Sequence, residues 1–273
     1  MKSIRLAAVF FLLTTSLWAK EPLVVAHRGA SGDAPENTIS AFKLAWERGA
    51  DAIEGDFHLT ADGHIVCIHD ANTKKVSGKS LVVRQSSLKQ LRELDVGTRH
   101  GKRFAKAVIP TLAEVLATVP AGKKIYIEIK SGASIIPYLF KEIDKSHLRP
   151  EQIVVISFHE QVIRGIEAKA PHFKTLWLVG FKKDDSKRLK PTMPAVLATL
   201  ARIKTDGLSS SSGITETSIR NVRQRGYEYH VWTIDDPAAA QRFRKWGAQS
   251  ITTNRPGRIR KHLVSETVER QAP

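Results

Sequence analysis

Residues 23–70 read LVVAHRGASGDAPENTISAFKLAWERGADAIEGDFHLTADGHIVCIHD, and this stretch decides the fold of the 273-residue chain. It holds three short apolar runs that end in charged residues: His27–Arg28, then Glu54 and Asp56, then His69–Asp70. An amphipathic helical segment separates the first two runs. Apolar strands that end in such side chains bring catalytic and metal-ligand chemistry to one edge of a sheet. We therefore interpret this stretch as most of an active site.

Short apolar runs and helical patterns alternate along the rest of the chain. The expected strands are 23–26, 52–57, 65–68, 124–130, 153–158, 175–179, 206–212, 228–234 and 250–253. Helices are expected after the caps Asn37 and Thr111, over 135–143, 161–170, 193–203, 216–225 and 237–246, and from Pro256. Such alternation predicts a parallel sheet with helices outside it. The spacing of 52–57 and 65–68 favours a hairpin, which leaves about eight strand–helix units, the number in an α/β (β/α)8 TIM barrel.

A polar and strongly basic segment, residues 71–110, forms a small insertion after the second strand. Its periodicity is weak, and Leu88, Leu91 and Leu94 predict one short helix. A stretch this long without firm structure is usually functional or mobile. Thr111 then begins a helix, and Glu114 completes a capping box. We expect one barrel domain over residues 22–265, with the insertion inside it.

The first 19 residues are typical of a secretory signal peptide. Lys2 and Arg5 precede an apolar core that starts at Leu6, and small residues near Ala19 offer a cleavage site. The core is shorter than the ~20 residues of a spanning helix, although an uncleaved anchor is the alternative. We expect export, to the periplasm or outside the cell. Cys67 is the only cysteine and lies in an apolar run, which indicates a buried hydrophobe rather than a nucleophile.

The chain is strongly basic, with a formal net charge of +16, or +14 without Lys2 and Arg5. This charge favours anionic partners such as phosphates, acidic lipid surfaces or nucleic acid. The sequence contains no nucleic-acid-binding motif, and its aromatic residues do not interleave with the basic ones. The charge by itself does not choose between a small anionic phosphate compound and peripheral contact with an acidic membrane surface, and a solvated basic surface is the alternative; nucleic acid is the least favoured partner. The sequence does not indicate the oligomeric state.

Three carboxylates are candidate metal ligands. Glu54 and Asp56 are two positions apart on one strand, so their side chains point to the same face. Glu128 lies near the end of the next parallel strand and completes the cluster. Crowded carboxylates require a cation, and oxygen ligands suit Ca²⁺ or Mg²⁺ best. The alternative is a set of ordinary strand ends, solvated or paired with Lys and Arg.

Two histidines, His27 and His69, each end an apolar strand. A metal-bound phosphate between two imidazoles allows one to act as base and the other as acid. Arg28 and Lys130 would neutralise the phosphate oxygens and the charge that grows on them in the transition state. The alternative for each histidine is a structural residue that hydrogen-bonds to backbone.

Other aromatic and imidazole side chains carry weaker signals. The remaining eight histidines are expected to be structural, although His159 and His230 lie near strand ends. Phe158 and Trp232 also end strands and are candidates for the floor of a substrate pocket, with core packing as the alternative. The serine run 209–212 lacks the Gly-x-Ser-x-Gly setting of a hydrolase nucleophile. No dinucleotide fingerprint or phosphate loop is present.

Several motifs together resemble those of the glycerophosphodiester phosphodiesterase family. They are AHRGA at 26–30, PENT at 35–38, AF at 41–42, GADAIEGDFHLTADG at 49–63, HD at 69–70, IEIK at 127–130, SF at 157–158, VWTID at 231–235 and ITTNRPG at 251–257. The resemblance covers residues 23 to about 260, in the family's order. It implies a barrel enzyme that hydrolyses glycerophosphodiesters to sn-glycerol 3-phosphate and an alcohol, with one divalent cation, Ca²⁺, Mg²⁺ or Mn²⁺.

The resemblance also implies roles for individual residues. His27 and His69 match the acid–base pair, Arg28 a phosphate ligand, Lys130 a cation beside the phosphate, and Glu54, Asp56 and Glu128 the metal ligands. The insertion corresponds to the variable segment that covers the family's site. Which histidine is the base, and whether water or a substrate hydroxyl attacks, stay open.

Some positions depart from the family's pattern. Gly55 stands where a larger apolar residue is expected, Phe57 where a smaller one is usual, and the strand 206–212 is rich in serine. We expect these positions at the pocket wall, where they affect the choice of substrate. Two rival functions follow: a related barrel phospholipase that acts on membrane lipids or lysophospholipids, and a phosphate-ester binding module without turnover.

Overall fold

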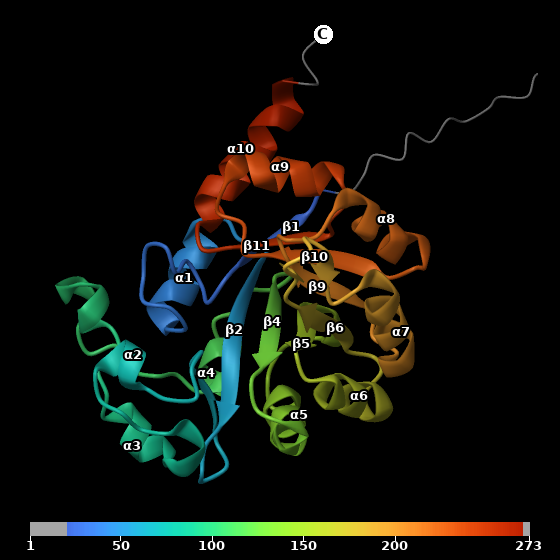
Figure 1. The fold of residues 1–273 in the computed structure, drawn as a ribbon. Helices are drawn as coiled ribbons and strands as arrows, with labels where there is room; N and C mark the ends of the chain where they lie inside the picture. The colour runs from blue at the N-terminus through green and yellow to red at the C-terminus, as the bar shows by residue number, and fades with distance from the viewer. Residues whose placement is uncertain (1–20, 270–273) are drawn as a thin grey trace, which may run out of the picture.

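Eight parallel strands close into a barrel in the computed structural model, which describes residues 21–269 (Figure 1). The barrel strands are β1 (Leu23–Ala26), β2 (Ala52–Leu59), β4 (Lys124–Ile129), β5 (Ile153–Ser157), β6 (Lys174–Val179), β9 (Gly207–Ser211), β10 (Glu228–Trp232) and β11 (Ser250–Thr253). The barrel closes because β1 pairs with β2 on one side and with β11 on the other. The (β/α)8 architecture predicted from strand–helix alternation is confirmed.

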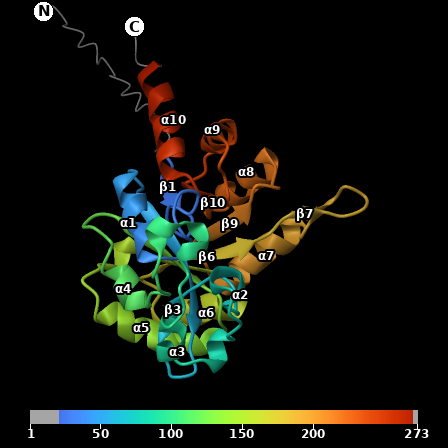
Figure 2. The ribbon, with the colours of Figure 1, turned by 90° about the vertical axis from the view of Figure 1, so that its left-hand side faces the viewer.

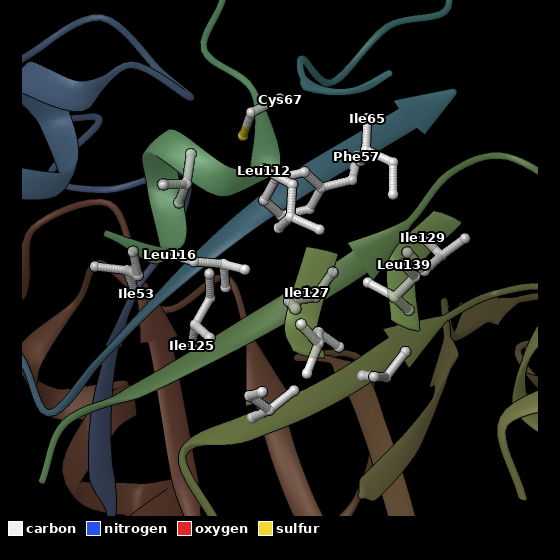
Figure 3. Close-up of a cluster of buried hydrophobic side chains, with 14 of the residues drawn as sticks. Ile53, Phe57, Ile65, Cys67, Leu112, Leu116, Ile125, Ile127, Ile129 and Leu139 are labelled. Carbon is white, nitrogen blue, oxygen red and sulfur yellow. The ribbon is translucent and has the colours of Figure 1, made fainter. Parts of the chain in front are cut away.

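Helices surround the barrel on its outside (Figure 1). They are α1 (Ile39–Glu47), α4 (Leu112–Leu116), α5 (Ile136–Asp144), α6 (Glu160–Lys169), α7 (Met193–Ile203), α8 (Glu216–Gln224), α9 (Pro237–Lys245) and α10 (Pro256–Glu269). Figure 3 shows the packing between the two layers: Leu116 of α4 lies beside Ile53 on β2 and Ile125 on β4, and Leu112 lies beside Phe57. Side chains alternate along a strand, so the next position on each strand points the other way, into the barrel. On β2 these inward positions include Glu54 and Asp56, and on β4 they include Glu128.

Gly55 and Phe57 of β2 were expected at the pocket wall, and the structure shows that this expectation is wrong. Gly55 and Phe57 belong to the layer between barrel and helices, and Phe57 is fully buried there. A Cβ at Gly55 would lie 3.1 Å from Sγ of Cys67 and 3.2 Å from Cζ of Phe42. The space that a larger residue would fill is therefore occupied by Phe42, and neither departure touches the pocket wall. Cys67 is buried, as expected.

The insertion is a folded unit rather than a loose loop. It follows β3 (Ile65–Cys67), which pairs antiparallel with β2 as the expected hairpin. It contains the short helices α2 (Lys74–Ser77) and α3 (Leu88–Arg92) and the 3-10 turns η1 (Val83–Gln85), η2 (Thr98–His100) and η3 (Lys102–Phe104). These pack on β3 through a hydrophobic cluster of their own: Val66, Ile68, Val83, Leu91, Leu94, Val96 and Ile109. The periodicity is weak because each element is only about one turn long.

Helix caps agree with the sequence in one case and differ in another. Thr111 and Glu114 form the expected capping box of α4. The cap of α1 is Thr38, whose Oγ1 accepts a hydrogen bond from the Ala41 amide, and not Asn37. Asn37 has a left-handed backbone, with φ at 59°, which turns its side chain toward β2. The side-chain amide of Asn37 donates a hydrogen bond to Asp56 of the carboxylate cluster and does not cap the helix.

One hairpin was not expected from the sequence. Strands β7 (Lys182–Lys183) and β8 (Leu189–Lys190) pair antiparallel between β6 and α7, and Figure 2 shows them extending away from the barrel. We refer to residues 180–191 as the β7–β8 hairpin. The expected signal peptide, residues 1–19, lies outside the described residues. Among residues 21–269, no helix combines the length and apolarity that crossing a bilayer requires.

Candidate active site

A cavity of about 110 Å³ opens at the carboxyl ends of the barrel strands. Its lining includes eight of the nine residues expected at the site: His27, Arg28, Glu54, His69, Glu128, Lys130, Phe158 and Trp232. The ninth, Asp56, is fully buried directly beside them. A larger cavity of about 480 Å³ lies at the opposite end of the barrel, where the strands begin. The residues that the sequence predicted for the site are gathered at the carboxyl end.

The three carboxylates converge as the strand pattern predicted. Asp56 on β2 is the direct lateral partner of Glu128 on β4, and Glu54 lies one step deeper on the same face of β2. One oxygen from each side chain lies within 4.8 Å of the others. All three residues are at most 9% exposed. This is an oxygen-only donor set of the kind that Ca²⁺ and Mg²⁺ use.

Electrostatics in this cluster indicate that a cation belongs there. Burial, then the neighbouring Asp56 and Glu128, raise the pKa of Glu54 well above its usual range. Burial and Asp56 raise the pKa of Glu128 to about 7. Oε1 of Glu54 and Oδ1 of Asp56 are buried without a hydrogen-bond partner. Buried carboxylate oxygens normally have partners, so a divalent cation would satisfy the donor set.

Two cations from neighbouring strands face these carboxylates. Nε of Arg28 lies 3.2 Å from Oδ2 of Asp56, and Nζ of Lys130 lies 2.8 Å from Oε1 of Glu128. Although burial opposes it, the attraction of Arg28 and then Lys130 lowers the pKa of Asp56. The backbone N–H of Arg28 also donates to Glu54. Asp56 therefore stays ionised among the three carboxylates.

His27 is oriented by an amide at the far end of the chain. Its Nδ1 lies 2.7 Å from Oδ1 of Asn254, whose Nδ2 donates to Oδ2 of Asp235 at 2.6 Å. Because the Asn254 amide nitrogen faces a carboxylate, its oxygen must accept, and the network assigns the proton to Nδ1 of His27. Nε2 is then left with its lone pair for the cavity. Burial, and then the Arg28 charge, lower the pKa of His27.

His69 has a different partner. Its Nδ1 lies 2.6 Å from Oδ1 of Asp70, the next residue in the chain. The hydrogen bond to His69 lowers the pKa of Asp70, so the partner is an ionised carboxylate. The partner of His27, in contrast, is the neutral amide of Asn254. The two histidines therefore have chemically different partners.

The two aromatic candidates stand at the mouth of the cavity. Phe158 and Trp232 pack edge to face, with ring centroids 5.7 Å apart, and Nζ of Lys130 lies 5.9 Å from the Phe158 centroid. Phe158 is 44% exposed. Both therefore line the cavity, but Phe158 forms its rim rather than the expected floor. The rest of the lining is Tyr126, Ile156, Leu178 and Thr252, together with Ser209 from the serine-rich strand.

Histidines expected to be structural have partners that fit this role. Nε2 of His58 lies 3.1 Å from the carbonyl of His69, and Nε2 of His159 lies 3.3 Å from the carbonyl of Lys130. His230 is buried toward the other end of the barrel, with its ring nitrogens beside Ser250 and Glu228. None of these three lines the cavity that holds His27 and His69.

Sequence reasoning missed three residues that hold the site together: Asn37, Asp235 and Asn254. Nδ2 of Asn37 donates to Asp56 at 2.8 Å, and its Oδ1 accepts from the Asp56 backbone N–H at 3.2 Å. The motifs PENT, VWTID and ITTNRPG contain these residues, so the signal was present without an assigned role.

Comparisons with known proteins agree with this site. The sequence profile of the Glycerophosphoryl diester phosphodiesterase family matches residues 27–258. The chain belongs to this family. It is 33% identical over 243 residues to the glycerophosphodiester phosphodiesterase of Caldanaerobacter subterraneus subsp. tengcongensis. The aligned region covers 86% of this chain and 94% of that protein. The glycerophosphodiester phosphodiesterase of Bacillus subtilis is 26% identical over 250 residues and covers 86% and 84%.

Solved structures show the same fold. The structure of an Oleispira antarctica phosphodiesterase in complex with the product sn-glycerol-3-phosphate has a TM-score of 0.81 at 23% identity and covers 89% of this chain and 97% of that one. The glycerophosphodiester phosphodiesterase of Agrobacterium tumefaciens has a TM-score of 0.71 at 26% identity and covers 87% and 98%.

Proposed function

We propose that this protein hydrolyses glycerophosphodiesters to sn-glycerol 3-phosphate and an alcohol. The observation that carries the proposal is one cavity in which three buried carboxylates lie beside two cations and two histidines with different partners. Membership of the family supports the reaction class. The Oleispira relative, whose structure holds sn-glycerol-3-phosphate, supports the class of product.

Glu54, Asp56 and Glu128 would hold one divalent cation, which fits their unpartnered oxygens and raised pKa values. The oxygen-only set suits Ca²⁺ or Mg²⁺, with Mn²⁺ as a third candidate. Such a cation, when bound, polarises a phosphoryl oxygen and offsets negative charge in the transition state.

Arg28 and Lys130 bind and orient the phosphate. Both now face carboxylates of the cluster, and both line the cavity. The guanidinium of Arg28 can offer two parallel N–H donors to phosphate oxygens, whereas the Lys130 ammonium acts as a point charge. Negative charge that develops on the phosphoryl oxygens therefore lies beside these two positive groups.

His27 acts as the general base and His69 as the general acid. Neutral His27 takes a proton at Nε2 from the attacking hydroxyl, which belongs to water or to the substrate's own glycerol. The oxygen then forms a bond to phosphorus while the bond from phosphorus to the leaving alcohol breaks. Attack by water gives sn-glycerol 3-phosphate directly, whereas attack by the glycerol hydroxyl gives a cyclic phosphodiester that water must open in a second step. Protonated His69, whose Nδ1 lies beside the carboxylate of Asp70, donates its Nε2 proton to the departing alkoxide. The step leaves His27 protonated and His69 neutral.

Chelation, mutation and a substrate panel test this proposal together. The protein from Lys20 onward is treated with a chelator, and glycerophosphocholine, glycerophosphoethanolamine and lysophosphatidylcholine are assayed before and after addition of Ca²⁺, Mg²⁺ or Mn²⁺. We expect release of sn-glycerol 3-phosphate from the soluble diesters only with metal. Preference for lysophosphatidylcholine would favour the phospholipase function. Binding without turnover would favour the binding module.

Mutation of the two histidines completes the test. We expect His27→Ala and His69→Ala each to lower kcat by about 10²–10⁴-fold. His64→Ala is the matched control, because its side chain is 50% exposed in the turn between β2 and β3. Unchanged hydrolysis by both active-site variants would overturn the proposal.

We also propose that the protein works after export, with cleavage near Ala19. The support is the N-terminal pattern of two basic residues, an apolar core and a small-residue exit. Cell fractionation and N-terminal sequencing of the mature protein test it. Recovery of the intact N-terminus in the cytoplasm would contradict it.

A further inference from the structure

Positive charge is concentrated in two segments of the chain. Residues 21–269 contain 39 basic and 27 acidic residues, a net charge of +12. The insertion, residues 71–110, has ten basic and two acidic residues, a net +8. The β7–β8 hairpin, residues 180–191, has five and two, a net +3. The rest of the described chain therefore carries only +1.

Both segments lie at the same end of the barrel as the active-site cavity. The insertion contacts the loop after β1: Nζ of Lys75 lies 3.2 Å from Oε1 of Glu36, and Arg103 donates to the carbonyl oxygen of Asp33. The hairpin directly follows β6 at its carboxyl end and extends outward (Figure 2). The excess charge of the described chain thus gathers around the entrance to the cavity.

The charged groups in these segments face solvent. All five basic side chains of the hairpin are exposed, as are nine of the ten in the insertion. The exception is Arg92, which pairs with Glu114. Arg188 in the hairpin is paired with Asp184 across the turn, 3.2 Å apart. Exposed charges of one sign on two projecting segments create a field that extends outward from the entrance.

An exposed aromatic side chain lies within this basic rim. Phe158 follows β5, the neighbour of β6, and it is 44% exposed beside the cavity. Basic groups around an exposed aromatic ring are typical of surfaces that bind the interface of an anionic bilayer. A nucleic-acid site would instead use several stacking aromatics along a basic groove.

We propose that the entrance face, formed by the insertion, the β7–β8 hairpin and Phe158, docks the protein on anionic lipid surfaces. The choice of partner rests in part on the proposed function, because glycerophosphodiesters are headgroup derivatives of phospholipids. Docking in this orientation points the cavity at the lipid surface, where such diesters and related headgroups arise. The attraction is electrostatic and falls with ionic strength.

A vesicle-binding experiment with matched variants tests this surface. The test variant, K182Q/K183Q/K187Q/K190Q, removes four charges from the hairpin. The control variant, K145Q/K169Q/K204Q/K245Q, removes four exposed charges at the C-terminal ends of α5, α6, α7 and α9, which point to the opposite end of the barrel. Both variants and the wild type are sedimented with phosphatidylcholine vesicles, with and without about one-third phosphatidylglycerol.

We expect the wild type and the control to bind only the anionic vesicles, and the hairpin variant to bind them at least about tenfold more weakly. Binding should also weaken when NaCl rises from about 0.05 M to about 0.5 M. Equal loss in both variants, equal binding to neutral vesicles, or tighter binding to a DNA duplex than to anionic vesicles would each overturn the proposal.

Hydrolysis of soluble glycerophosphocholine separates this proposal from the proposed function. We expect kcat/KM of the hairpin variant to stay within about twofold of the wild type, because its four lysines do not line the cavity. A wild type that binds anionic vesicles but does not hydrolyse the diester would contradict only the proposed function. A wild type that hydrolyses the diester but does not bind vesicles would contradict only the docking surface.

Discussion

Nδ1 of His27 lies 2.7 Å from Oδ1 of Asn254, although 227 positions separate them in the chain. The contact exists because β1 and β11 are neighbours where the barrel closes. Asn254 is in turn fixed by Asp235, which accepts from its amide and from its backbone N–H. The proton on Nδ1 of His27 is therefore positioned by Asn254, which directly follows the last strand of the barrel.

Removal of this amide should impair catalysis without impairing binding. We expect Asn254→Ala to lower kcat by about 10–100-fold, as for other residues that orient a reactive imidazole, with KM changed little. Steady-state kinetics on glycerophosphocholine measure this, with Gln161→Ala on the exposed face of α6 as control. A large rise in KM at unchanged kcat would show that Asn254 serves substrate binding instead.

The leaving group should distinguish the two histidines. A nitrophenolate leaves without protonation, so a nitrophenyl diester does not need the acid that His69 supplies. We expect His69→Ala and Asp70→Asn to lose about tenfold or less with this substrate but at least about 10²-fold with glycerophosphocholine. His27→Ala should be equally impaired with both. If His27→Ala instead loses activity only with glycerophosphocholine, and His69→Ala is equally impaired with both substrates, His27 is the general acid and His69 the general base.

The carboxylate cluster should make the stability of the metal-free protein depend on pH. Folding raises the pKa of Glu128 from 4.5 to about 7, so its protonated form is favoured in the folded state. Glu128 therefore does not lower the free energy of unfolding below pH 4.5. Above pH 4.5 it lowers the free energy of unfolding increasingly as the pH rises to 7, by an amount on the order of 3 kcal/mol. In chelator, Glu128→Gln should gain stability relative to the wild type as pH rises.

Thermal melts between pH 5 and pH 8, with and without metal, measure this difference. Glu93→Gln is the control, because Glu93 is exposed at the end of α3. Metal should stabilise the wild type strongly at the upper pH and Glu128→Gln much less. A constant difference between the wild type and Glu128→Gln across this range would show that Glu128 is not destabilised by burial.

Asn37 allows backbone and side-chain effects to be separated. Its φ of 59° is easy for glycine but costs alanine roughly 1 kcal/mol or more. We expect Asn37→Gly and Asn37→Ala to weaken metal binding alike, since both lose the hydrogen bonds to Asp56. Only Asn37→Ala should lose further stability from backbone strain. Calorimetric metal titration and thermal melts measure the two effects.

The parts of this protein that were predictable from its sequence are those with a strong local pattern. Strand alternation placed Glu54 and Asp56 on one face, and strand order brought Glu128 beside them. The eight-unit barrel followed from the same regularity. Gly55 and Phe57 were assigned to the wrong side because a comparison of residue sizes ignores strand alternation, which turns them toward α1 and α4.

The rest depends on contacts that have no local pattern. Asn37 resembles an ordinary helix cap, and only its left-handed backbone turns its amide toward Asp56. Asn254 and Asp235 orient His27 from the far end of the chain. The β7–β8 hairpin has strands of two residues, too short to show periodicity among so many charges.

The separate hydrophobic cluster of the insertion has a consequence for how this protein diverges. Five residues of the insertion form this cluster with Val66 of β3 and with Ile68, and none of the seven belongs to the clusters that stabilise the barrel. Mutations there can reshape the entrance while the strands that hold the reactive groups stay in place. Relatives can thus exchange this segment to reach new substrates or surfaces, and inherit the chemistry unchanged.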